Sequence, residues 1–195
     1  PDRKPMTAAV RRSPVRRVLR LLLWMGALLL VMAGAGALWQ HLAERRDAER
    51  FPPPGQRIDI GGHRLHLHCA GRGAPTVWLE AGLGNDVNHW SGVFDALAAR
   101  QRTCAYDRAG LGWSDAGPMP RDAGQIVDEA VRLLRASGEP PPYLLVGHSN
   151  GGAYVRLIAA ALPEQVAGLV LVDPSQTHPE GCPPLPGSMR VIYGT

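Results

Sequence analysis

The feature that most constrains the fold is an alternation, between residues 56 and 172, of short apolar runs with segments of helical period. The apolar runs are short and bounded by glycine or proline, whereas the segments between them place apolar side chains three and four residues apart. Strands that alternate with amphipathic helices form a mainly parallel sheet covered by helices on both faces. We therefore expect an α/β domain with the hairpin RIDIGGHRLHLHCAG followed by the strands TVWLEAG, RTCAYD, YLLVG and VAGLVLVD.

Capping residues set the ends of the expected helices. Asp122 followed by Gln125 is similar to a capping box and Gly138 is a typical stop, so residues 122–138 should form a helix. Apolar spacing predicts another helix over residues 90–97, and a third over residues 150–162 that ends at Pro163. In such sheets the chemistry gathers at the carboxyl ends of the strands.

An uncharged apolar run of residues 21–38 follows five arginines, which are Arg11, Arg12, Arg16, Arg17 and Arg20. The run is just long enough to cross the hydrocarbon of a bilayer, and the positive-inside rule places the arginines in the cytoplasm. We expect a basic cytoplasmic head at 1–20, a transmembrane anchor or signal at 21–40, and a charged, proline-rich linker at 41–55. Small residues at 33–37 would suit a signal peptidase, so cleavage and secretion are the alternative. In both cases the folded domain lies outside the cytoplasm, in the periplasm or the extracellular space.

Composition argues against nucleic acid and zinc as ligands. The chain has 21 basic and 17 acidic side chains, and seven of the basic ones lie in residues 1–20. The rest of the chain carries 14 basic and 16 acidic side chains, whereas a nucleic-acid-binding domain concentrates basic side chains on its folded part. Three cysteines without a CxxC motif do not make a usual zinc site. We expect no metal, no cofactor and no nucleic-acid partner.

A serine lies between two glycines where the run YLLVG meets the next helix. Gly147, Ser149 and Gly151 form a Gly-x-Ser-x-Gly motif, which becomes specific when a strand precedes it and a helix follows it. The sharp turn exposes the serine hydroxyl above the sheet, and Cβ atoms at the glycine positions would collide with neighbouring elements. The turn also aims the first N–H groups of the helix, including that of Asn150, at negative charge beside the serine. Ser149 is therefore a candidate nucleophile.

Two further motifs follow strand ends. The segment LEAGLGN contains Gly82, and the segment YDRAGLGWSD contains Asp107, Arg108, Gly110, Gly112 and Ser114. Together with the serine motif, they resemble the α/β-hydrolase family over residues 56 to about 175. The first segment stands at the place of the family's His-Gly oxyanion loop, with Ala81 where His is common. The second is similar to the family's loop after the fourth strand.

The resemblance implies roles for these residues. Ser149 would be the nucleophile, and the backbone N–H groups of Leu83 and Asn150 would form the oxyanion hole. Asp107 and Arg108 would form a buried ion pair that braces the loop, rather than act as catalytic groups. A serine at this position disfavours the epoxide hydrolase and dehalogenase chemistry that the family performs with an aspartate.

The resemblance also places the catalytic acid and histidine on loops after later strands. The recognisable fold ends at residues 166–172, and the proline-rich residues 176–195 resemble the start of the family's lid region. Asp173 is disfavoured as the acid because Asp-Pro favours a turn, and His178 is disfavoured as the base because it follows too closely. We therefore expect a fragment without its last strands, acid and base, which would be a poor hydrolase by itself.

The same resemblance pairs Cys69 with Cys104. In the family's sheet order the second and fourth strands are antiparallel neighbours, so the end of one lies beside the start of the other. An extracytoplasmic location would let a disulfide between them persist. The alternative is two buried free thiols. Cys182 would be unpaired.

The predicted function is that of a membrane-tethered serine hydrolase, which cleaves a small-molecule ester or related acyl bond through an acyl-enzyme. Amide hydrolysis, thioester hydrolysis and cofactor-free peroxidation stay open within the fold. The alternative from another class is a non-catalytic hydrolase-like module that binds a ligand or partner. A histidine on the loop after an eighth strand would distinguish the two.

Overall fold

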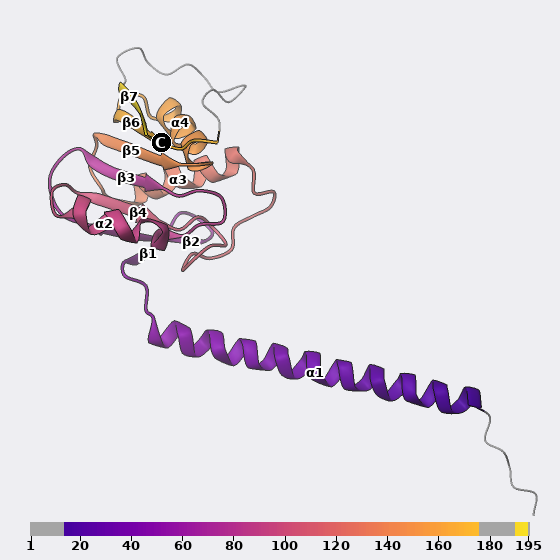
Figure 1. Ribbon diagram of the computed structural model, residues 1–195. Coiled ribbons are helices and arrows are strands. Elements are labelled where there is room, and N and C mark those ends of the chain that lie inside the picture. The colour runs from indigo at the N-terminus through magenta and orange to yellow at the C-terminus, as the bar shows by residue number, and fades with distance from the viewer. Residues whose placement is uncertain (1–13, 176–189, 195) are drawn as a thin grey trace, which may run out of the picture. The chain divides into compact units, whose positions relative to one another are not determined.

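The computed structural model describes residues 14–175 and 190–194, and the chain divides into two compact units between Pro52 and Pro53 (Figure 1). The first unit contains helix α1, Pro14–Arg50. An 18-residue window of this helix has a mean hydropathy of 2.2, and none of the window is buried. Helix α1 is therefore long and apolar enough to cross a membrane, although a signal sequence near an N-terminus has the same properties.

Helix α1 extends further than the sequence predicted. Residues 41–50, which we expected in the linker, continue the helix to Arg50. They are mostly Ala, Leu, Glu and Arg, which have high helix propensity, and the Gln40 amide donates to Glu44 Oε1 one turn later at 2.9 Å. The helix ends just before Pro52, because the residue preceding a proline is disfavoured in helical conformation. The linker is thus limited to residues 51–55.

The second unit is built on a seven-stranded sheet with the order β1-β2-β4-β3-β5-β6-β7. The strands are β1 Gln56–Asp59, β2 Arg64–Ala70, β3 Thr76–Glu80, β4 Thr103–Tyr106, β5 Tyr143–His148, β6 Val166–Val172 and β7 Arg190–Gly194. Strand β2 pairs antiparallel with β1 and β4, and the other neighbours pair in parallel. The mainly parallel sheet expected from the sequence is confirmed.

Strand β7 corrects one part of the sequence analysis. We assigned residues 176–195 to a lid region and ended the sheet at β6, but Arg190–Gly194 pairs in parallel with β6 along Gly168–Val172. The run RVIYG contains β-branched and aromatic residues that favour strands, and it pairs the backbone groups that an edge strand would leave open. Residues 176–189, including His178 and Cys182, lie outside the described residues.

Helices cover both faces of this sheet (Figure 1). The helical elements are η1 Val87–Trp90, α2 Ser91–Ala98, α3 Ala123–Ser137 and α4 Gly151–Ala161. On one face, Val77 of β3 is buried in a cluster with Phe94 of α2. On the other face, the neighbouring Trp78 is buried in a cluster with Leu133 of α3 and Ile158 of α4. Successive residues of β3 therefore enter different cores, which explains why its sequence is apolar without alternation.

The ends of α3 are those that the sequence predicted. The Asp122 side chain accepts a hydrogen bond from the Gln125 backbone N–H at 2.9 Å, which caps the first turn. Gly138 ends the helix with a φ of +72°, a left-handed conformation that glycine adopts without steric cost. These caps fix where the chain leaves the loop after β4 and so help to position that loop.

Candidate active site

Ser149 lies in the turn between β5 and α4 with a backbone φ of +52°. This left-handed conformation costs an L-residue about 1–2 kcal/mol, so it persists only where the surroundings impose it. A Cβ on Gly147 would lie 2.5 Å from the carbonyl oxygen of Gly151, and a Cβ on Gly151 would collide with the carbonyl oxygen of Glu80. The turn can form only because both positions are glycine. It has the strand–turn–helix geometry that a Gly-x-Ser-x-Gly motif requires.

The hydroxyl of Ser149 contacts a residue that the sequence analysis missed. Its Oγ lies 3.0 Å from Oγ of Ser175, and the backbone N–H of Ser175 donates to the Ser149 carbonyl oxygen at 3.2 Å. The Ser149 N–H donates to the carbonyl oxygen of Val172 at 3.1 Å, which joins the turn to the end of β6. The available signal was topological, because Ser175 follows β6 at the sheet edge where β5 also ends.

The loop after β3 approaches the serine closely. A Cβ on Gly82 would lie 3.3 Å from Ser149 Cβ and 3.1 Å from His148 Nδ1. A larger residue at position 82 would require Ser149 or His148 to shift by a few tenths of an ångström, so glycine lets the loop approach without that shift. Leu83 continues the loop, and Asn150 follows the serine as the N-cap residue just before α4. The two predicted oxyanion donors are thus the residue after Gly82 and the residue after Ser149, and their role in binding an oxyanion stays a prediction.

A buried arginine holds the loop after β3 in place. Arg108 Nη1 donates to Glu80 Oε1 at 2.5 Å and to the carbonyl oxygen of Ala81 at 2.7 Å, while Nη2 donates to the carbonyl oxygen of Gly82. Glu80 is fully buried, Arg108 is 6% exposed, and the hydroxyl of Tyr106 donates to the second carboxylate oxygen. Glu80 is the second residue that sequence reasoning missed, although an acid at the end of an apolar strand indicates a buried partner.

The predicted ion pair between Asp107 and Arg108 is therefore wrong. Asp107 instead contacts His66 Nδ1 at 2.8 Å, and both of these side chains are fully buried. Its carboxylate also accepts the backbone N–H groups of Val87 at 2.7 Å and Trp113 at 3.0 Å. Successive residues after a strand point in opposite directions, so Asp107 joins Val87 to Trp113, whereas Arg108 binds the start of the loop after β3.

The glycines predicted in this second loop have distinct conformational roles. Gly110 has a φ of +82° and Gly112 a φ of +49°, both in the left-handed region. A Cβ on Gly112 would also collide with the Asp107 carboxylate, so the loop needs a glycine there to wrap around that group.

Burial dominates the ionisation of the Glu80 pair. Removal from water raises the pKa of Glu80 above its ordinary value, and the charge of Arg108 and the Tyr106 hydrogen bond oppose that shift. Burial raises the pKa of Tyr106 well above its ordinary value, and the neighbouring Glu80 carboxylate raises it further. Tyr106 therefore stays a neutral hydrogen-bond donor at any physiological pH.

Several of the described histidines contact side chains other than Ser149. His66 pairs with Asp107, His68 stacks on Phe94 with ring centroids 4.5 Å apart, and His89 stacks on His148 at the same separation. No histidine in residues 14–175 or 190–194 hydrogen-bonds to Ser149. Asp173, the disfavoured acid, has a left-handed φ of +41°, and its N–H donates to the Gly194 carbonyl oxygen at the end of the β6–β7 pairing. In the described part of the chain, no base is hydrogen-bonded to the candidate nucleophile Ser149.

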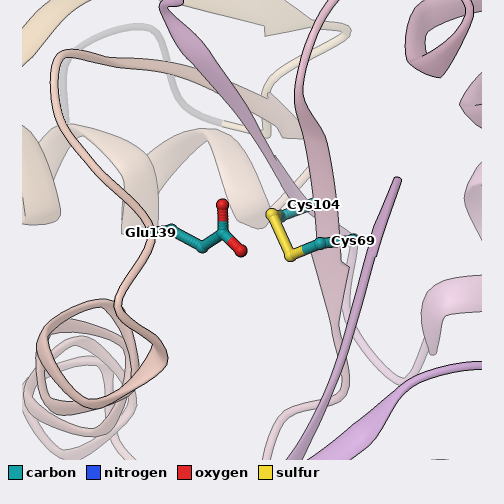
Figure 2. Close-up of side chains that lie close together, drawn as sticks. All are labelled: Cys69, Cys104 and Glu139. Carbon is teal, nitrogen blue, oxygen red and sulfur yellow. A yellow bond between two sulfur atoms is a disulfide. The ribbon is translucent and has the colours of Figure 1, made fainter. Parts of the chain in front are cut away.

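Cys69 lies directly opposite Cys104 across β2 and β4, and the two form a disulfide (Figure 2). The Glu139 carboxylate lies beside them, so that one ligand atom from each residue falls within 4.8 Å of the others. However, both sulfurs are joined to each other, and Arg102 binds the carboxylate through hydrogen bonds of 2.8 and 2.5 Å. The group is a disulfide beside an ion pair rather than a set of metal ligands.

Comparison with known proteins decides the family. A family model for the alpha/beta hydrolase fold matches residues 75–188, which is more than half of the chain. The chain belongs to the α/β-hydrolase family. The match includes the loop after β3, the loop after β4 and the turn that carries Ser149, so the resemblance drawn from these motifs is confirmed.

The relatives of this α/β hydrolase differ widely in their names. The efuK protein of Hormonema carpetanum, named as a probable transporter, is 38% identical over 124 residues, or 60% of this chain and 18% of that protein. RutD of Azorhizobium caulinodans, whose name proposes a carbamate hydrolase, is 34% identical over 113 residues, or 58% of this chain and 42% of that one. A solved structure of the meta-cleavage product hydrolase CumD of Pseudomonas fluorescens IP01 matches with a TM-score of 0.57 and 25% identity, covering 63% of this chain and 46% of that one. This α/β hydrolase chain thus spans less than half the length of each of these relatives.

Proposed function

We propose that this α/β hydrolase is membrane-tethered and cleaves an ester or related acyl bond through an acyl-enzyme formed on Ser149. The observation that carries the proposal is the left-handed φ of +52° at Ser149, in a turn where Gly147 and Gly151 remove every colliding Cβ. A strained serine that faces the top of the sheet is the geometry of a nucleophile elbow. A serine in an ordinary turn would not need this conformation.

The proposed reaction begins with attack of Ser149 Oγ on the substrate carbonyl carbon. The carbonyl oxygen becomes an oxyanion that the backbone N–H groups of Leu83 and Asn150 would bind. Arg108 contributes indirectly, because its bonds to the carbonyl oxygens of Ala81 and Gly82 fix the direction of the loop that carries the Leu83 N–H. Collapse of the intermediate releases the alcohol and leaves an acyl-enzyme, which water then hydrolyses to release the acid and regenerate Ser149. A base takes the Ser149 proton and returns it to the leaving alcohol, then takes a proton from the attacking water and returns it to Ser149 Oγ. This base is expected, as the family resemblance implies, on a loop after a later strand.

The proposed tether is helix α1. Its 37 residues extend about 55 Å at 1.5 Å per residue, more than the roughly 30 Å of hydrocarbon in a bilayer. The arginines that precede its apolar part favour a cytoplasmic N-terminus and a hydrolase domain on the opposite side. Cleavage after the apolar run would release the same domain instead. Protease protection of the domain in sealed vesicles or spheroplasts distinguishes these topologies from a cytoplasmic location.

One observation favours a second candidate, a non-catalytic binding module. The side-chain partner of Ser149 Oγ within the described residues is the hydroxyl of Ser175, which cannot act as a base at neutral pH. In such a module the loop after β3 and the turn at Ser149 would bind a ligand without turning it over. The two candidates predict opposite results in a hydrolysis assay.

The test compares hydrolysis of p-nitrophenyl butyrate by the full-length protein, its Ser149→Ala variant and a matched Ser91→Ala control. Ser91 begins α2 at an exposed position, so its loss should leave turnover unchanged. We expect Ser149→Ala to lower kcat by at least about 10³-fold, as removal of a serine nucleophile does in other hydrolases. Equal turnover by all three proteins would refute the nucleophile. No turnover by any of them would favour the binding module.

A further inference from the structure

A cavity of about 430 Å³ opens beside the loop after β3. It is lined by Leu83 and Gly84, by residues of the loop after β4, and by Ile126 of α3 and Tyr154 of α4. Its volume is within the usual range for small-molecule sites. Because Leu83 also carries a proposed oxyanion N–H, the cavity begins next to the position where a substrate carbonyl would bind.

The charged side chains in the walls are already neutralised. Arg108 is paired with the fully buried Glu80, and the ring of Tyr154 lies 5.5 Å from its guanidinium carbon. Arg121 is held by Glu129 through two hydrogen bonds of 2.6 Å each. Neither arginine is available to balance the charge of an anionic ligand, so the cavity suits a neutral one.

The mouth of the cavity exposes large apolar side chains to water. Leu83 is 75% exposed and Met119 is 80% exposed, and both line the cavity. Apolar surface of this kind at the edge of a pocket gains free energy when an apolar ligand covers it. Methionine also adapts its shape readily to different ligands, which suits a flexible chain.

We propose that this cavity holds the acyl chain of a neutral, medium-chain ester or thioester while Ser149 attacks its carbonyl carbon. This inference rests on the proposed function and specifies its substrate class. With the carbonyl oxygen at the Leu83 N–H, the acyl carbons leave along the wall that Leu83 itself forms. Each methylene that the cavity buries should raise the binding constant about fourfold. Extension from butyryl to octanoyl should therefore raise kcat/KM by at least about tenfold, even if half of the added chain stays in water.

The first experiment measures chain-length preference in the full-length protein reconstituted in nanodiscs. Kinetics with p-nitrophenyl butyrate and octanoate are compared for the wild type, Ala116→Trp and Ala123→Trp. Ala116 is an exposed residue of the cavity wall, so a tryptophan there fills the cavity without entering the core. Ala123 is an exposed residue in the first turn of α3 outside the wall and serves as the matched control. We expect Ala116→Trp to lower the octanoate-to-butyrate ratio of kcat/KM about tenfold, with Ala123→Trp unchanged. An equal ratio in all three proteins would overturn the proposal.

The second experiment separates this proposal from the nucleophile assignment. Binding of octanamide and butanamide, two neutral probes, is measured by calorimetry in the Ser149→Ala background with and without Ala116→Trp. Tighter binding of octanamide that Ala116→Trp abolishes supports the cavity even if Ser149 proves not to be the nucleophile. Octanamide binding no tighter than butanamide, in a protein whose hydrolysis depends on Ser149, would refute the acyl cavity and leave the proposed function intact.

Discussion

Replacement of Arg108 by methionine should destabilise the domain and slow the chemistry together. The side chain is 6% exposed and donates to the Glu80 carboxylate and to the carbonyl oxygens of Ala81 and Gly82. Methionine has a similar length but no donor, so all three acceptors lose a buried partner. Removing one member of a buried ion pair costs about 3–5 kcal/mol, a large share of the roughly 5–15 kcal/mol that stabilises most domains.

The size of the kinetic effect follows from the same contacts. Without Arg108 the two carbonyls can rotate, and the Leu83 N–H loses its fixed direction beside Ser149. Loss of a single oxyanion donor typically lowers kcat by about 10²–10³-fold, so a misdirected donor should cost on the order of tenfold to 10²-fold. Arg108→Lys keeps the charge but presents one compact ammonium group in place of a fork of N–H donors, so its effects should be intermediate.

The assay combines urea denaturation of the full-length protein in mild detergent with the rate of Ser149 labelling by a fluorophosphonate. Adding Glu80→Gln to Arg108→Met removes the stranded charge and should recover part of the lost free energy of unfolding, because the two residues interact directly. A contrary result is that Arg108→Met lowers the free energy of unfolding by less than about 1 kcal/mol, as loss of a surface ion pair does, and leaves the labelling rate unchanged. That result would refute the claim that Arg108 holds the loop after β3.

Three further predictions follow from contacts outside this brace. Ser175→Ala should change the labelling rate of Ser149 several-fold, because the Ser175 hydroxyl lies 3.0 Å from Ser149 Oγ, and Ser175→Thr, which keeps a hydroxyl, should restore it. Equal rates for all three proteins would exclude a positioning role. Burial lowers the pKa of His68 below its ordinary value of 6.5, so its contribution to stability is complete above pH 6.5 and is lost as the pH falls through the lowered value. In His68→Gln the denaturation midpoint should therefore fall less steeply below pH 6.5 than in the wild type. Parallel plots of midpoint against pH for the two proteins would contradict this. Since the structure joins Cys69 to Cys104, thiol titration of the denatured, unreduced protein should find both cysteines unreactive, and reaction of both would show free thiols.

Sequence predicted the features that depend on local patterns. The order of strands and helices follows from apolar periodicity, and the ends of α3 follow from the chemistry of Asp122 and Gly138. The turn at Ser149 was predictable because any sequence that forms it must have residues without a Cβ at positions 147 and 151, where a Cβ would collide with the backbone. The proximity of Gly82 to the serine follows from parallel topology, which brings the ends of β3 and β5 to one edge.

Long-range partner choice was not predictable in the same way. Asp107 and Arg108 are adjacent in sequence, and their opposite charges suggested a pair, but backbone alternation directs them to His66 and Glu80. The Asp-Pro pair at residue 173 indicated a turn after β6, but no local pattern indicates that this turn brings the Ser175 hydroxyl to Ser149. Strand β7 is short and follows a proline-rich segment, so its pairing with β6 had no periodic signal.

The assignment of Ser149 as the nucleophile is tested most directly by peptide mapping of the full-length protein after reaction with a fluorophosphonate. We expect a single modified peptide, the one that contains Ser149, because its strained turn lies beside the proposed oxyanion donors, the N–H groups of Leu83 and Asn150. The Ser149→Ala variant should give no adduct under the same conditions, and Ser91→Ala should label like the wild type. An adduct on another residue, or equal labelling of the Ser149→Ala variant, would contradict the assignment of Ser149 as the nucleophile.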